Sequence, residues 1–304
     1  MSPAPVSERG RVWITGHHGF TGRYLSAALA HEGFEPIAAP DLPVFDLRDA
    51  GSIERELDRV RPDYVVHLAA VSYVAHGNAT DFYAINTVGT ARLLECLARG
   101  GLSLRKVVLA SSANVYGNAT REPITEDTPL APVNHYACSK LAMEMMARTL
   151  FDRLPILIAR PFNYTGVGQS EKFLVPKLVR HFAQCAPVIK LGNLDVVRDF
   201  SDVRMLAAAY CRLLASPLVS TEVNICSGLG RSLQSIVDTL RERADHAPAI
   251  EVDPALVRGT ELKRLVGGNA RLLDAVGALP YADFDATLTW MLERATEAGG
   301  HQPV

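Results

Sequence analysis

Short apolar runs alternate with helical patterns through the first half of the chain, and this alternation limits the fold more than any other feature. Strand-like runs occur at Arg11–Thr15, Tyr64–Ala70 and Leu154–Arg160, and helical patterns such as Thr21–Gly33 separate them. The runs do not alternate polar with apolar residues, so each strand should be buried on both faces. The pattern predicts an α/β fold with a doubly wound parallel sheet between about residues 10 and 160.

A glycine-rich turn joins the first predicted strand to the first predicted helix. Gly16, Gly19 and Gly22 in TGHHGFTG give a G-x-x-G-x-x-G spacing. Glycine at these positions permits a tight turn and the close approach of a pyrophosphate, and the helix that follows presents free amide hydrogens to it. An ordinary glycine-rich turn is the alternative, but the placement between strand and helix favours a Rossmann-type dinucleotide site.

The second half of the chain has a different rhythm. Helices are expected near 173–184, 203–214 and 284–296, mixed with short strands. We therefore expect a dinucleotide-binding Rossmann domain over residues 1–165, with returning segments near 195–228. A smaller C-terminal α/β lobe that binds the substrate should take up most of residues 166–304.

Composition argues against several classes of protein. The 304 residues carry a formal net charge of −2, which gives no support for binding nucleic acid or a membrane surface. No apolar run approaches the length of a membrane span, and the N-terminus lacks the pattern of a signal peptide. Five scattered cysteines without a CxxC predict neither a disulfide framework nor a metal site, and they favour a cytoplasmic location.

Tyr136 and Lys140 stand four residues apart where a helix is expected to begin, in VNHYACSK. Residues at that spacing share a helix face, so the ammonium should lower the pKa of the phenol. Ser111 and Ser112 end the fourth predicted strand, at the sheet edge where ligands bind in open α/β folds. Ser112, Tyr136 and Lys140 together predict proton transfer to a carbonyl oxygen beside a nicotinamide. Taken alone, the Tyr–Lys pair fits an exposed helix face equally well.

These motifs resemble those of the extended short-chain dehydrogenase/reductase superfamily over nearly the whole chain. The matching stretches are the glycine turn, HLAA, Asn86, SSANVYG, YACSK and ARPFN. The resemblance implies that Ser112, Tyr136 and Lys140 form the catalytic trio and that the cofactor is NADP or NAD. It also implies a set of cofactor-binding residues: Gly16, Gly19, Phe20, Thr21, Gly22, Asp46, Leu47, Leu68, Ala69, Ala70, Asn86, Ser111, Tyr136, Lys140 and Pro161.

Two aspartates follow the second predicted strand, and each has more than one interpretation. Asp41 could accept a hydrogen bond from a free 2′-hydroxyl, which would favour NAD, or it could be a loop residue. Asp46 could meet the adenine amino group. The choice between NADP and NAD stays open at this stage.

The second half resembles the GDP-sugar-modifying branch of the superfamily, which includes the GDP-4-dehydro-6-deoxy-D-mannose reductases and the GDP-mannose 4,6-dehydratases. The matching stretches are RPFNYTGVGQ, LGNLDVVRDFSDV, NICSG and VDPALVRGTELKRLVGG. The resemblance implies a GDP-linked 4-keto-6-deoxy sugar as ligand. The implied substrate-binding residues are Ser72, Asn114, Asn163, Lys177, Arg198, Arg258 and Glu261.

The chemistry of these side chains agrees in outline. Guanidinium groups such as those of Arg198 and Arg258 suit a diphosphate. Glu261 could accept from guanine or from ribose hydroxyls. A solvated helix face is the alternative for Lys177, and an ion pair with a neighbouring aspartate is the alternative for Arg198.

The residues after the catalytic serine argue against dehydration. Dehydratases of this branch carry Glu or Asp-Glu there, whereas this chain has Ala113 and Asn114, and an amide cannot shuttle a proton. We expect NAD(P)H-dependent reduction of the C4 ketone, giving GDP-D-rhamnose or a related GDP-6-deoxyhexose. An NDP-sugar 4-epimerase with tightly bound NAD is the alternative. A catalytically silent dinucleotide-binding scaffold is a third possibility.

Two predicted helices carry apolar residues on more than one face. They span Phe82–Arg99 and Tyr136–Phe151. Both faces could be buried within one chain. The resemblance instead favours a homodimer in which two copies form a four-helix bundle.

Overall fold

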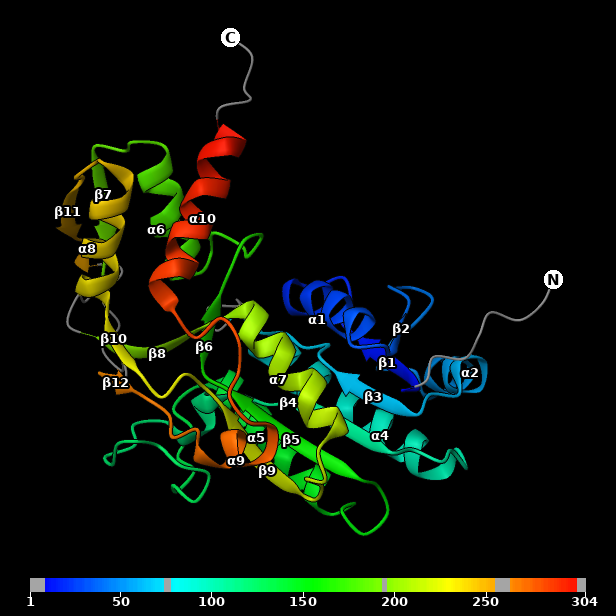
Figure 1. Cartoon of the computed structure of the whole chain (residues 1–304). Helices are drawn as coiled ribbons and strands as arrows, with labels where there is room; N and C mark the ends of the chain where they lie inside the picture. The colour runs from blue at the N-terminus through cyan, green and yellow to red at the C-terminus, as the bar shows by residue number, and fades with distance from the viewer. Residues whose placement is uncertain (1–8, 74–77, 193–195, 255–262, 300–304) are drawn as a thin grey trace.

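A six-stranded parallel sheet forms the central layer of the protein (Figure 1), whose computed structural model describes residues 9–73, 78–192, 196–254 and 263–299. The strand order is β2-β1-β3-β4-β5-β9. The order reverses between β1 and β3, which is the switch point where open α/β sheets bind ligands. The bounds are β1 (Arg11–Thr15), β2 (Glu35–Ala38), β3 (Tyr64–His67), β4 (Lys106–Ala110), β5 (Ile156–Pro161) and β9 (Thr221–Ile225). The predicted Rossmann-type doubly wound parallel sheet is confirmed.

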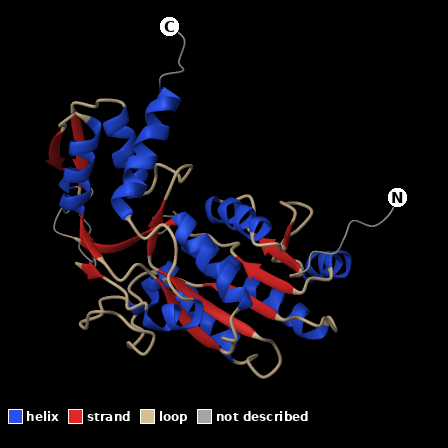
Figure 2. Ribbon diagram, in the orientation of Figure 1, coloured by secondary structure: helices blue, strands red, loops and turns tan. Residues whose placement is uncertain are grey.

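Helices cover both faces of the sheet (Figures 1 and 2), and the apolar strands explain why. Val12 and Ile14 of β1 point into one core, while Trp13 points into the other. The first core is closed by α1 (Phe20–His31), α7 (Val203–Ala215) and α9 (Ala270–Val276). The second is closed by α2 (Ala50–Val60), α4 (Thr90–Arg99) and α5 (His135–Arg148). Burial on both sides leaves no place in these strands for alternating polar residues.

A smaller lobe packs beyond the carboxyl ends of the strands. Its helices α6 (Leu174–Ala183), α8 (Leu233–Ala244) and α10 (Phe284–Gly299) enclose an apolar core together with β7 (Val188–Leu191), which pairs with β11 (Ala249–Val252). Ser232 caps α8 by accepting a hydrogen bond from Ser235 N at 3.0 Å, as its position before the helix predicts. Among the described residues, no helix is long and apolar enough to cross a membrane.

A second small sheet joins the lobe to the central layer. Its middle strand β8 (Val197–Asp202) pairs with β6 (Asn163–Thr165), β10 (Gly230–Ser232) and β12 (Arg264–Leu265). After β8 the chain returns to the central layer as α7 and β9, and later again as α9. The division near residue 165 therefore stays a prediction, because segments from both halves build the same layer.

A long helical stretch lies beside α5. It runs from α3 (Ala79–Asp81) through the π-helix η1 (Phe82–Gly89) into α4. The sequence predicts helix here but not the wider π-turns. Such turns often occur at functional sites, and here the side chains of Asn86 and Thr87 in η1 bond Ser139 of α5.

A buried ion pair fastens α5 to the sheet. The Arg160 guanidinium on β5 meets the Glu144 carboxylate on α5 at 2.6 Å and 3.0 Å, and both side chains are fully buried. Ser111, just after β4, donates a hydrogen bond to the same carboxylate, and Arg160 also donates to Tyr116 Oη at 2.8 Å. Tyr116 lies in the short helix η2 (Ala113–Tyr116). Strand, helix and loop are thus held together by a network in which every charge has a partner.

Replacing Arg160 by Met should lower the free energy of unfolding by about 3–5 kcal/mol, because the Glu144 carboxylate would be left buried without its partner. Urea unfolding at neutral pH measures the change. As a control, Arg294→Met breaks an exposed pair with Glu297 and should cost under about 1 kcal/mol. Equal losses in the two variants would contradict the importance of the buried pair.

Candidate active site

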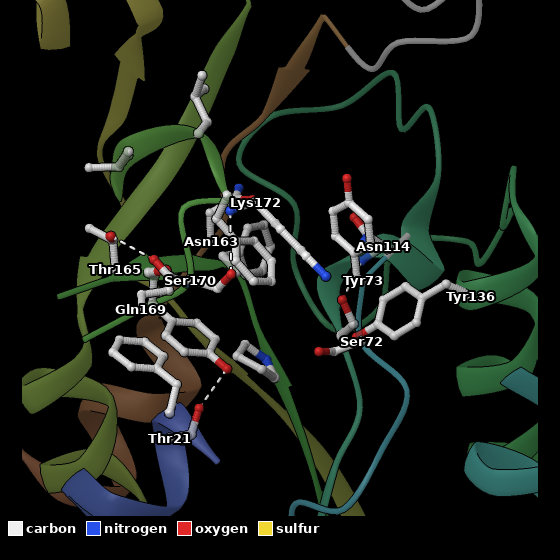
Figure 3. Close-up of a pocket in the computed structure, with 18 of the residues that line it drawn as sticks. Thr21, Ser72, Tyr73, Asn114, Tyr136, Asn163, Thr165, Gln169, Ser170 and Lys172 are labelled. Atoms are coloured by element: carbon white, nitrogen blue, oxygen red, sulfur yellow. Dashed lines mark hydrogen bonds between the residues drawn. The ribbon is translucent and has the colours of Figure 1, made fainter. Parts of the chain in front are cut away.

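A cleft of about 990 Å³ opens between the carboxyl ends of the central strands and the smaller lobe (Figure 3). Most residues that the sequence singles out meet in this cleft, although they come from distant parts of the chain. Those that line it are Gly16, Gly19, Phe20, Thr21, Gly22, Leu68, Ala69, Ala70, Ser72, Ser111, Ser112, Asn114, Tyr136, Lys140, Pro161, Asn163, Lys177 and Arg198.

The remaining predicted residues lie elsewhere. Asp46 forms a two-pronged ion pair with Arg48, which lowers the pKa of the Asp46 carboxyl and occupies the oxygens that were expected to meet adenine. Leu47 is buried in the core. Asn86 is fully buried behind the cleft wall. Arg258 and Glu261 lie outside the described residues.

The glycine turn has the shape that a pyrophosphate requires. Gly16 has a φ of +72°, and a Cβ there would come within 2.7 Å of Ala69 N. A Cβ on Gly22 would approach His17 O to 2.3 Å. Helix α1 begins directly after Gly19, and no side chain caps its first turn. The first amide hydrogens of α1 are therefore available to an anion, so this turn fits the phosphates of NADP or NAD.

Asp41 lies on the exposed loop after β2. Its carboxylate is 3.7 Å from Nε2 of His18 in the glycine turn. Asp41 of this loop and His18 of the glycine turn thus place a carboxylate beside an imidazole, and neither cofactor is favoured by charge alone.

Ser112 and Tyr136 meet inside the cleft. Ser112 follows β4, and its hydroxyl accepts a hydrogen bond from Asn114 N at 3.2 Å. Tyr136 is the second residue of α5, whose N-cap Asn134 accepts from Ala137 N at 2.9 Å. The Tyr136 hydroxyl is hydrogen-bonded to Ser112. This places a phenol and an alcohol where they can share one carbonyl oxygen of a ligand.

Burial sets the protonation of the tyrosine and the lysine. It raises the pKa of Tyr136 to about 12, although the hydrogen bond with Ser112 acts in the opposite direction. Burial also lowers the pKa of Lys140 to about 8, against the attraction of Glu144. The expected lowering of the tyrosine pKa by the ammonium was wrong, because Lys140 Nζ donates to Ala110 O at 2.7 Å and burial dominates. At neutral pH, Tyr136 therefore holds its proton.

Asn86 ties the catalytic helix to the loop after β3. Its amide accepts from Val71 N at 2.9 Å and donates to Val71 O at 3.0 Å. The same amide donates to Ser139 Oγ at 3.1 Å, and Ser139 in turn donates to Tyr136 O. Asn86 therefore positions Tyr136 from behind, through the backbone.

A fully buried histidine lies beneath the same loop. His67 Nδ1 is 2.6 Å from Thr15 Oγ1, and Nε2 is 2.9 Å from Thr90 Oγ1. Thr90 donates its own proton to Asn86 O, so Nε2 must carry the imidazole proton, and Nδ1 accepts from Thr15. Burial and the nearby Lys140 lower the pKa of His67 to about 3, so the ring is neutral. This hydrogen-bond chain links the ends of β1 and β3 to η1.

The cleft is strongly cationic. Among the described residues that line it there is no Asp or Glu, whereas Lys140, Lys172, Lys177, Lys190 and Arg198 all contribute. Only Lys106 and Lys263, of all the lysines in the chain, lie outside this lining. The arrangement favours a ligand that carries several negative charges.

For Lys177 the alternative was a solvated helix face, and for Arg198 it was an ion pair with a neighbouring aspartate. Lys177 Nζ donates to Lys190 O at 3.1 Å within the cleft lining, so its side chain is not merely solvated. Arg198 donates to Val197 O and Lys263 O. Both neighbouring carboxylates have other partners, because Asp202 pairs with Arg204 and Asp199 accepts hydrogen bonds from the backbone and hydroxyl of Ser227.

Sequence reasoning missed part of the lining. Tyr73, Tyr164, Lys172 and Lys190 all face the cleft. Tyr164 directly follows Asn163 of a recognised motif, so its position was a usable signal. Lys172 belongs to no such pattern, and only the fold brings it opposite Tyr73.

Known proteins are similar to this chain in sequence over most of its length. A model described as NAD dependent epimerase/dehydratase family matches residues 12–226. The chain is 34% identical over 268 residues to GDP-6-deoxy-D-talose 4-dehydrogenase of Aggregatibacter actinomycetemcomitans, covering 88% of this chain and 91% of that protein. It is also 34% identical over 283 residues to GDP-6-deoxy-D-mannose reductase of Pseudomonas aeruginosa, covering 89% and 92%.

A solved structure has the same fold. RMD from Pseudomonas aeruginosa, complexed with NADPH, superimposes with a TM-score of 0.87 and 32% identity, covering 95% of this chain and 99% of that one.

The buried imidazole predicts acid sensitivity. The unfolded state binds a proton below about pH 6.5, whereas folded His67 stays neutral down to about pH 3. Its contribution to stability is therefore complete above pH 6.5 and is lost as the pH falls. Between pH 7 and pH 5 the loss should be about 2 kcal/mol. Urea unfolding of wild type and His67→Gln at both pH values isolates this contribution, and an equal drop in both proteins would contradict it.

Proposed function

The chain belongs to the NAD dependent epimerase/dehydratase family, and from this premise we propose that it reduces the C4 ketone of a GDP-4-keto-6-deoxyhexose with NADPH or NADH. The product would be GDP-D-rhamnose or a related GDP-6-deoxyhexose. The observation that carries the proposal is the meeting of Ser112 and a protonated Tyr136 in a cleft lined with lysines.

In this mechanism, side chains of the cleft bind and protonate the oxygen of the ketone. Ser112 donates a hydrogen bond to that oxygen and steadies the charge that develops on it. Tyr136 gives the proton that completes the alcohol. Lys140, bonded to Ala110 O and one helical turn from Tyr136, would hold the ribose of the bound nicotinamide cofactor. The bound nicotinamide would supply the hydride, and the glycine turn and α1 would hold its phosphates.

Two observations support reduction over other chemistry. The raised pKa of Tyr136 keeps the phenol in its acid form at neutral pH, as proton donation requires. Asn114, in the cleft lining beside Ser112, offers an amide where dehydration would need a carboxyl group. A 4-epimerase with retained NAD would use the same trio, so it is distinguished by how the cofactor is consumed.

The choice of a GDP-linked sugar rests on the charge of the cleft and on similar proteins. A diphosphate matches a lining that is rich in cations and free of carboxylates among its described residues. The two relatives named above are described by chemistry on GDP-linked 6-deoxyhexoses.

Purified protein should oxidise NADPH or NADH in proportion to added GDP-4-keto-6-deoxyhexose. The decrease in near-UV absorbance of the reduced cofactor gives the rate, and anion-exchange chromatography gives the product. A reductase consumes one cofactor for each sugar. Interconversion of 4-epimers without added cofactor would instead establish the epimerase.

Variants of two tyrosines connect the activity to the cleft. Tyr136→Phe should lower kcat by about 10²- to 10⁴-fold, because the proton donor is lost. Tyr83→Phe is the control, since that hydroxyl bonds His135 Nδ1 at 3.0 Å outside the cleft lining. Full activity of Tyr136→Phe would argue for a different proton donor.

We also propose that two copies pair through the stretches Phe82–Arg99 and Tyr136–Phe151. The elements η1 and α5 pack together within the chain. Each still leaves a large apolar side chain exposed: Val88 by 46% and Met145 by 42%. Pairing with a second copy would cover both side chains in a four-helix bundle.

Sedimentation should show a dimer for the wild type and a monomer for Met145→Glu, because a buried carboxylate would disfavour the bundle. Leu229→Glu is a suitable control, since Leu229 is exposed by 61% on a loop far from α5 in the sequence. A monomeric wild type would overturn the proposed pairing.

A further inference from the structure

Lys172 extends into the substrate half of the cleft and is absent from every motif discussed so far (Figure 3). It lies just before α6, on the smaller lobe. Its ammonium lies 5.7 Å from the centre of the Tyr73 ring, which belongs to the loop after β3 on the opposite wall. The side chain therefore spans the cleft from one wall to the other, on the side where Ser72 and Tyr136 point.

Aromatic packing holds the Tyr73 ring that the Lys172 ammonium contacts. The Phe173 ring meets the Tyr73 ring edge-on, with centroids 6.2 Å apart. Tyr73 thus contacts two consecutive residues of the smaller lobe, one by its face and one by edge packing. Lys172 is exposed, and its ammonium lies over the Tyr73 ring.

The segment that carries Lys172 is anchored to the cofactor half. Tyr164 Oη is 2.8 Å from Thr21 Oγ1 in the first turn of α1, and Tyr24 Oη donates to Val167 O at 2.7 Å. Gln169 then closes the loop by donating to Tyr164 O at 3.1 Å. These bonds hold the backbone that leads to Lys172 against the glycine-turn half of the cleft.

The Lys172 ammonium has no carboxylate partner among the described residues. The neighbouring Glu171 pairs with Arg180, and the described lining of the cleft contains no acidic side chain. A lysine on an ordinary surface is solvated by water and meets little repulsion. The Lys172 ammonium instead points into a cleft lined by other cations, which repel it. A bound anion would reverse that repulsion into attraction.

We propose that Lys172, with the Tyr73 ring as its platform, binds the diphosphate of the sugar nucleotide at the end nearest the sugar. This assignment rests on the proposed function, since it requires a nucleoside diphosphate-sugar as substrate. The ammonium acts as a point charge on phosphate oxygens and holds the sugar in front of Tyr136. Lys172 is accordingly a substrate-binding residue that the sequence motifs do not assign.

Direct binding of GDP and GMP tests the assignment, because the base and ribose contributions cancel in the ratio of the two affinities. Titration calorimetry is done with NADP⁺ present at saturation. Wild type should bind GDP more tightly than GMP, and Lys172→Met should reduce that ratio by about ten- to a hundredfold. Lys172→Arg keeps the charge and should retain most of the ratio. The affinity for NADP⁺ should be the same in all variants.

Arg153→Met is the matched control. It also removes one positive charge, but Arg153 lies on an exposed loop before β5, outside the cleft lining. Its GDP-to-GMP ratio should equal that of wild type. An unchanged ratio in Lys172→Met would overturn the assignment while leaving the reductase proposal intact. If wild type binds neither nucleotide and oxidises no cofactor with GDP-linked ketosugars, the proposed function fails as well.

Discussion

The pairing of Arg160 with Glu144 is the interaction on which the active centre depends. Tyr136, Lys140 and Glu144 follow one another at helical spacing along one face of α5, so the position of the carboxylate fixes the height and rotation of the two residues above it. Arg160 holds that carboxylate from β5, and Ser111 holds it from the end of β4. Two charges in a dry interior are tolerable only because every oxygen and most N–H groups have partners.

A second constraint comes from charge. The described lining of the cleft carries lysines and an arginine without a single carboxylate. Without a bound anion, these cations repel one another. Bound anions would offset this repulsion. In the proposed function, the cofactor phosphates would meet the glycine turn and the diphosphate of the substrate would meet the smaller lobe. The Thr21–Tyr164 contact ties the two halves together.

The sequence predicted the central layer well because its signals are local. The first strand, Arg11–Thr15, appears with the bounds that were expected. It did not predict β6, β10 and β12, since strands of two or three residues exist only through pairing with β8. The pKa of Tyr136 was also misjudged, because burial raises it, and spacing along the sequence does not reveal burial.

Sequence by itself determined the alternation of strand and helix, the glycine turn and the spacing of Tyr136 and Lys140, because backbone geometry and side-chain period act over a few residues. Tertiary structure alone decided that Asn86 contacts Ser139 from behind the cleft, and that Lys172 faces Tyr73 across about a hundred residues of chain. Those outcomes depend on which distant segments meet, and no local pattern encodes the distance between them.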